Sequence, residues 1–119
     1  MTVESDFYAL LSGNAGVVAL VGARIYPDSL PEKCAYPAIV FSRTRTETLR
    51  TLAGVAVGAD VDLTAQCWAE TRTAADAVAL AVVAALAGTD FETPGPEAAA
   101  DPETGLLASL LIVSTFAAA

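Results

Sequence analysis

Two kinds of spacing between hydrophobic residues divide the chain into helical and extended segments. Phe7, Leu10 and Leu11 recur at the spacing of one helix face, which predicts an N-terminal helix. A short second helix is predicted through residues 17–21, and Gly22 is expected to end it.

A proline-containing stretch follows these helices. Pro27, Pro31 and Pro37 each lack an amide hydrogen and bias the preceding residue toward extended geometry. The sequence therefore predicts a rigid, extended lead-in to the first long strand. The start of this stretch, at residues 24–26, is itself strand-like.

The first long strand is predicted over residues 38–46, which are rich in β-branched and aromatic side chains. Because side chains alternate between the two faces of a strand, we expect Ile39 and Phe41 to share a face with Arg43 and Arg45. The sheet core would then give way to a basic surface along this strand.

A hairpin is predicted to join this strand to the next. Residues 46–59 contain two glycines and no fixed period, which predicts a long hairpin tip. From Asp60 onward, hydrophobic and polar residues alternate strictly as far as Trp68. This alternation is typical of an antiparallel strand with one buried face.

The last third of the chain predicts a helix and a final strand. Thr73 and Asp76 resemble a capping box, and the helix is expected to run to about Ala87. Residues 90–105 are rich in Pro, Glu and Asp and predict a mobile or extended connection. The continuous hydrophobic run after Gly105 predicts a strand covered on both faces. The helix has a predicted apolar stripe of Val78, Val82, Ala85 and Leu86.

These elements predict an α+β fold in the order α-α-β-β-α-β. A hairpin and a later strand form a small antiparallel or mixed sheet, and the helices pack against it as a two-layer sandwich. The length of 119 residues suits one domain, so residues 1–119 are expected to form a single domain.

Composition and charge add an expectation about partners. Hydrophobic residues make up 55% of the chain, which favours some burial of apolar surface against other subunits. The net charge of −8 lies in the second half, where Arg72 is the one basic residue after Arg50. This balance argues against nucleic-acid binding, which needs a basic footprint. A basic patch on one copy meeting an acidic patch on the next is one interpretation, and simple solubility is the other.

The sequence predicts no membrane partner. The longest hydrophobic run, residues 77–88, is shorter than the roughly 20 residues that span a bilayer. The first residues are acidic and do not resemble a signal peptide, so we expect the chain to fold in the cytoplasm.

Candidate catalytic and metal-binding groups are sparse. The chain contains no histidine, and Cys34 and Cys67 lie far apart, which disfavours a zinc site. Both cysteines are expected to be small buried residues, with a disulfide between them left open. Asp60 and Asp62 share a strand face, but no third ligand accompanies them, so a solvated face is favoured over a metal site. No serine has a predicted base. We therefore expect a protein that is not an enzyme and has no cofactor or metal.

The candidate site is instead a subunit or tube interface. An arginine group is expected to face acidic residues of a neighbour, and an apolar hairpin end is expected to pack on a neighbour or on a tube. Trp68 is predicted as core at the strand end or, alternatively, as an interface anchor. The full set is Arg43, Arg45, Arg50, Leu52, Val55, Val57, Asp60, Asp62 and Trp68.

Four segments together carry a family resemblance. They are "GARIYPDSLPE" at 22–32, "YPAIVFSR" at 36–43, "VDLTAQCWAETRTAADAVALAVVAAL" at 61–86 and "DPETGLLASLLIV" at 101–113. In this order and spacing they resemble the tail completion, or tail terminator, proteins of long-tailed bacteriophages and prophages. The last strand departs from the family pattern, because it is almost wholly apolar where members often carry basic and aromatic residues.

The resemblance implies a small α+β subunit of a homo-oligomeric, hexameric ring. Such a ring caps the head-proximal end of the tail tube, stops its growth and joins it to the head-tail connector or neck protein. DNA passes through the ring without sequence-specific binding. The implied localisation is the virion tail, after assembly in the host cytoplasm. Two alternatives stay open: another neck or stopper-type connector protein, and a host small-ligand-binding or regulatory α+β module.

Overall fold

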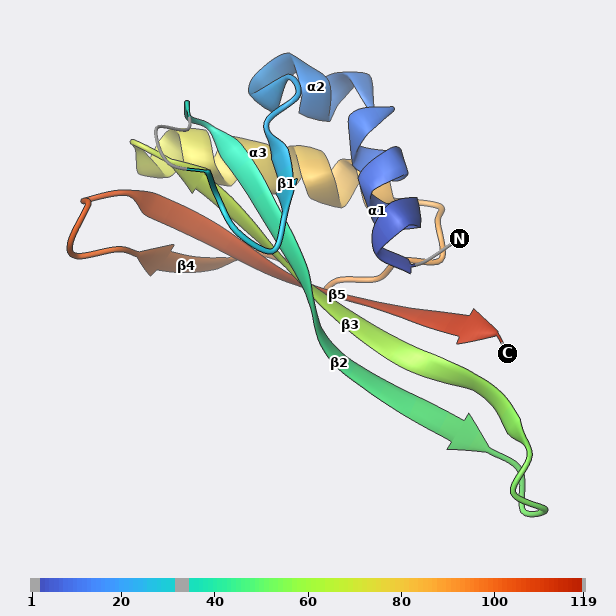
Figure 1. The fold of residues 1–119 in the computed structure, drawn as a ribbon. Helices are drawn as coiled ribbons and strands as arrows, with labels where there is room; N and C mark the ends of the chain where they lie inside the picture. The colour runs from blue at the N-terminus through green and yellow to red at the C-terminus, as the bar shows by residue number, and fades with distance from the viewer. Residues whose placement is uncertain (1–2, 32–34, 119) are drawn as a thin grey trace.

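Among the described residues, a five-stranded mixed sheet carries three helices on one of its faces (Figure 1). The structure, a computed structural model, describes residues 3–31 and 35–118. The α+β class and the packing of helices against a mixed sheet are confirmed. The helices are α1 (Val3–Ser12), α2 (Ala15–Val21) and α3 (Arg72–Leu86). The strands are β1 (Ile25–Pro27), β2 (Ala38–Arg50), β3 (Ala56–Ala69), β4 (Glu97–Ala100) and β5 (Leu107–Ala118).

The strand order β1-β2-β3-β5-β4 adds two short edge strands to the predicted fold. β1 forms at the strand-like start of the proline-containing lead-in and pairs in parallel with β2. β4 lies within residues 90–105, which were predicted as a mobile or extended connection, and pairs antiparallel with β5, so the extended alternative holds for Glu97–Ala100. Its sequence of glutamate and alanines has low strand propensity, so its extended state depends on the pairing with β5.

The hydrophobic core lies between the helices and one face of the sheet. Phe7 of α1 contacts Phe41 of β2 edge to face, with ring centroids 5.6 Å apart. The predicted stripe of α3 is buried, which confirms the helical spacing. The largest fully buried side chains are Phe7, Leu11, Ile39, Leu63, Leu111, Val17, Val21, Val61, Val78, Val82 and Val113.

In the part of the chain that the structure describes, no helix covers the opposite face of the sheet (Figure 1). Leu111 and Val113 of β5 face the helices and are buried, whereas Ile112 and Phe116 alternate with them and are about half exposed. The prediction that the last strand is covered on both faces is therefore wrong for residues 112–116, whereas Ala108 and Ser109, which face opposite sides, are both buried. A continuous hydrophobic run is also compatible with one covered face and one bare apolar face.

A register shift on β2 separates two arginines that were expected to share a face. Arg43 pairs with Leu63 and Arg45 pairs with the next residue, Asp62, so Thr44 forms a bulge. Because side chains alternate along a strand, the extra residue turns Arg45 away from the helices while Arg43 stays on their side.

The β2–β3 hairpin continues beyond the helices as an arm (residues 44–60; Figure 1). The predicted tip of residues 46–59 is wrong in length, because paired strands extend to Arg50 and resume at Ala56. The turn proper is residues 51–55, closed by the Thr51 amide donating to the Val55 carbonyl at 2.9 Å. Most side chains of the arm are exposed, so the sequence has no alternation of hydrophobic and polar residues there that would predict strands.

Helix α3 begins two residues earlier than its predicted capping box. The side chain of Thr71 accepts the amide of Ala74 at 3.1 Å, so Thr71 is the N-cap and Thr73 lies inside the helix. Asp76 instead accepts the Ser109 hydroxyl of β5 at 2.6 Å. Within the described ranges no helix is long and apolar enough to span a bilayer.

Candidate assembly interface

The arm ends in exposed hydrophobic side chains, which we call the arm tip (residues 51–57). Leu52 is fully exposed, Val55 is 61% exposed and Val57 is 44% exposed. These are the three residues that the sequence predicted as an apolar hairpin end. Exposed aliphatic groups clustered on a projecting turn are typical of a contact surface for another molecule.

The three predicted interface arginines lie in three different settings. Arg43 donates from Nε to Glu4 Oε1 of α1 at 2.7 Å. Arg45 is ion-paired with Glu47 and lies 3.9 Å from Asp62 Oδ2. Arg50 donates to the Gly54 carbonyl at 3.2 Å, and the described part of the chain offers its guanidinium no carboxylate partner. The arginines therefore do not form one basic patch. At the arm tip, the guanidinium of Arg50 remains able to bind a carboxylate of another molecule.

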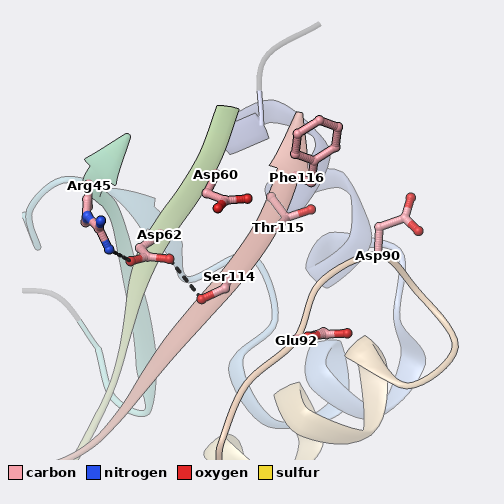
Figure 2. A pocket seen from close by; sticks show the side chains of 8 residues that line it. All are labelled: Arg45, Asp60, Asp62, Asp90, Glu92, Ser114, Thr115 and Phe116. Atoms are coloured by element: carbon pink, nitrogen blue, oxygen red, sulfur yellow. Dashed lines mark hydrogen bonds and ion pairs between the residues drawn. The ribbon is translucent and has the colours of Figure 1, made fainter. Parts of the chain in front are cut away.

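An acidic pocket lies at the root of the arm, where β3, β5 and the loop after α3 meet (Figure 2). Its volume is about 370 Å³. Four carboxylates and one guanidinium line it, which leaves a formal excess of negative charge. The lining residues are Arg45, Asp60, Asp62, Asp90, Glu92, Ser114, Thr115 and Phe116.

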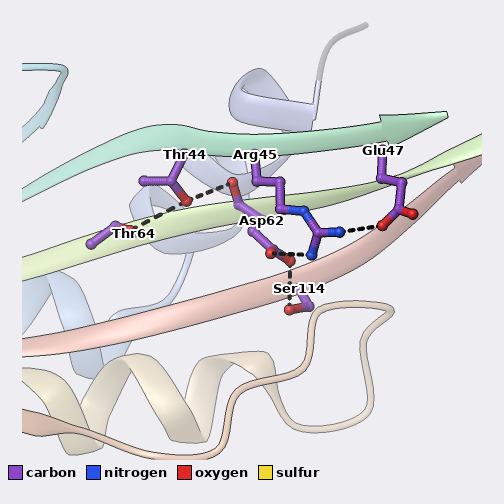
Figure 3. Close-up of polar contacts among 6 residues, drawn as sticks. All are labelled: Thr44, Arg45, Glu47, Asp62, Thr64 and Ser114. Atoms are coloured by element: carbon purple, nitrogen blue, oxygen red, sulfur yellow. Dashed lines mark hydrogen bonds and ion pairs between the residues drawn. The ribbon is translucent and has the colours of Figure 1, made fainter.

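Among the residues that the structure describes, Asp62 is the one pocket carboxylate held by a network of side chains (Figure 3). Its Oδ1 accepts the Ser114 hydroxyl at 2.9 Å, and its backbone carbonyl accepts the Thr44 hydroxyl at 3.2 Å. Asp60 pairs across the strands with Glu47, another acid, and like charges at such a position repel. The pocket therefore favours a further cation from outside the chain.

The bare face of the sheet holds the predicted anchor Trp68. Its ring is half-buried and lies opposite the small residues Ala38 and Ala108 of the neighbouring strands. Its Nε1 donates to Gln66 Oε1 at 3.1 Å. Trp68 is separate from the helix-covered core and lies at the end of β3 away from the arm tip.

Cys67 lies beside Trp68 on the strand but points into the core. It is a free thiol, and burial raises its pKa to about 12, so it stays protonated and unreactive at neutral pH. This confirms its prediction as a small buried residue, while Cys34 lies outside the described residues. In the described ranges, no three Asp, Glu or Cys side chains gather closely enough to hold a metal ion.

Sequence reasoning missed two of the four carboxylates of the acidic pocket and its aromatic residue. Asp90 and Glu92 lie in the segment predicted as a mobile or extended connection, in which no contact partner was foreseen, but Glu92 forms a bridge with Ser114 that holds the loop along β5. Phe116 was assigned to a strand with both faces covered. One sequence feature could have indicated its exposure. The last strand has more apolar residues than one covered face of a sheet can bury.

Comparison with known proteins places this fold. A family model described as "Tail completion protein gp17" matches residues 5–109. Among solved structures, a chain from the "Virion of native gene transfer agent (GTA) particle" has the same fold, with a TM-score of 0.79 and 21% sequence identity. That similarity covers 98% of this chain and 95% of the other. No curated protein matches the sequence.

Proposed function

Because this chain belongs to the tail completion protein gp17 family, whose members are structural virion proteins, we propose that it is a tail terminator. In this role it forms a ring that caps the head-proximal end of the phage tail tube and stops the growth of the tube. The same ring joins the tube to the head-tail connector or neck protein. The family match over residues 5–109 carries this proposal.

The shape of the subunit supports assembly into a closed ring. A ring of identical subunits uses a head-to-tail contact, in which two different patches of the same chain meet. The arm tip is a projecting apolar patch, and the acidic pocket is a hollow, charged patch elsewhere on the chain. The proposed ring is a hexamer.

The charge of the chain suits the passage of DNA through the ring. The net charge of −8 repels phosphates, so DNA slides past without sequence-specific binding. The proposed role needs no catalysis, cofactor or metal. The proposed location is the head-proximal end of the tail in the virion, after assembly in the host cytoplasm.

Electron microscopy of the purified protein, alone and mixed with tail tubes, tests the proposal. We expect six-fold rings and tubes with a cap at one end, while tubes without the protein grow to variable length. A protein that stays monomeric and never binds a tube end would overturn the terminator assignment. Binding to the neck or connector protein without binding to tubes would favour the stopper-type alternative.

A further inference from the structure

We propose that the arm tip of one copy of this chain docks into the acidic pocket of the next copy. In this contact Arg50 faces the pocket carboxylates, and Leu52 and Val55 pack beside Phe116. The inference rests on the proposed ring and assigns its subunit contact to particular residues.

The arm tip has a positive charge and an apolar surface that the described residues of its own chain do not cover. Arg43, Arg45 and Arg72 each lie within 4 Å of a carboxylate, whereas Arg50 reaches only the Gly54 carbonyl among the described residues. Leu52 has no cover at all. The tip therefore offers one guanidinium beside aliphatic side chains.

The acidic pocket offers the complementary features. Asp60, Asp90 and Glu92 have no ion pair in the part of the chain that the structure describes, and Arg45 is already shared between Glu47 and Asp62. The side chain of Phe116 stands at the rim of the pocket and is about half exposed (Figure 2). A guanidinium among carboxylates beside an aromatic ring is a favourable setting for an arginine.

The occupant of the pocket must come from another molecule. Asp60 and Ala56, the first residue of β3, are four residues apart on this extended strand, which places the arm tip about 13 Å from the pocket. The paired strands hold the tip pointing away from the pocket, so it does not fold back (Figure 1). A contact from tip to root between copies is head-to-tail, which is the kind that closes a ring.

The ring of Phe116 lies against Gly58 of the arm, where the missing side chain leaves room for it. A Cβ built on Gly58 would lie 2.4 Å from Phe116 Cζ, so the ring lies directly over this residue. The hairpin and β5 thereby present the rim of the pocket as one surface. In this contact, charge complementarity would guide two subunits together, and the apolar contact would slow their dissociation.

Charge reversal tests the contact with two variants of the full-length protein. The tip variant is Arg50→Glu, and the pocket variant is Asp90→Lys with Glu92→Lys. We expect each variant alone to lower ring formation on tail tubes about tenfold, with the fold unchanged by circular dichroism. The matched control for the pocket is Glu97→Lys with Glu103→Lys, two exposed acids outside it, and we expect normal rings from it.

Mixing the two defective variants gives the sharpest outcome. In an alternating ring the reversed tip meets the reversed pocket, and each native pocket receives a native tip, so an even-numbered ring is restored. Combining all three substitutions in one chain should restore rings as well. Rings that form normally from each single variant, or defects that neither mixing nor combination repairs, would overturn the contact and leave the terminator proposal standing. Failure of the unmodified protein to form rings would overturn both.

Discussion

The body of the molecule and its arm share two strands but are held by different forces. In the body, the helices and the sheet beneath them enclose side chains such as Leu63, which is fully buried. In the arm, the same strands continue with exposed side chains on both faces, held mainly by backbone pairing. Burial of side chains specifies the body, whereas the side chains of the arm are free to contact other molecules.

Two leucine substitutions make the largest difference between these regions. We expect Leu63→Ala to lower the free energy of unfolding by about 2–5 kcal/mol, because it removes buried methyl groups and leaves a cavity. Leu52→Ala at the arm tip should change it by less than about 0.5 kcal/mol, because that side chain is already in water. Urea unfolding of both variants measures the contrast. Equal losses of unfolding free energy would show that the side chain of Leu52 is packed against the chain and not exposed to water.

The buried thiol predicts a pH dependence that belongs to the body alone. Burial raises the pKa of Cys67 from 9.0 to about 12, so the unfolded chain loses its thiol proton first as the pH rises. Stability from this group is complete below pH 9 and declines toward pH 12, by about 1.4 kcal/mol per pH unit at most. The free energy of unfolding is measured across this range for the native chain and for Cys67→Ala. A constant difference between the two would contradict the prediction.

Gly58, where the arm meets β5, should show an intermediate effect. In Gly58→Ala the new methyl group would lie 2.4 Å from Phe116 Cζ and 2.5 Å from the Ala117 carbonyl oxygen, so β5 must move. We expect a loss of about 1–3 kcal/mol. Gly54→Ala is the matched control, because Gly54 also has a positive φ but open space around it. Urea unfolding should place Gly58→Ala clearly below Gly54→Ala, and equal stabilities would refute the close contact.

The smallest expected effect comes from the ion pair that links the root of the arm to α1. Replacing Arg43 with alanine should cost about 0.2–1 kcal/mol, because both partners are partly exposed to solvent. A double-mutant cycle with Glu4→Ala isolates the pair, and its coupling energy should fall in 1 M salt. A coupling that does not depend on salt would argue against an electrostatic link.

The sequence was informative where side chains are buried in a regular period. The stripe of α3 and the alternation along β3 each predicted an element, because one side of each faces the core. The family resemblance was confirmed by the match over residues 5–109. The composition of the predicted hairpin tip also identified Leu52 and Val55 as an apolar hairpin end, since hydrophobic residues in a turn are unusual.

The remaining features depend on tertiary pairing that leaves no local pattern. β4 forms because β5 pairs with it, although its residues do not favour strands. The bulge at Thr44 adds one residue to one strand only, and no composition signal marks such a position. The acidic pocket joins Asp60 to Asp90 through the bridge between Glu92 and Ser114, which is visible only once β5 lies beside the loop.

The bulge at Thr44 also divides β2 into a part that does not tolerate insertions and a part that does. Residues before the bulge must keep their present faces of the sheet, because a shift of one position would carry Phe41 out of the core. Beyond the bulge, two residues can be inserted into each of the two strands without moving any core residue to the other face. Each such insertion lengthens the arm by about 7 Å. The reach of the subunit is therefore adjustable independently of its stability, and arms of different length can be expected on the same body.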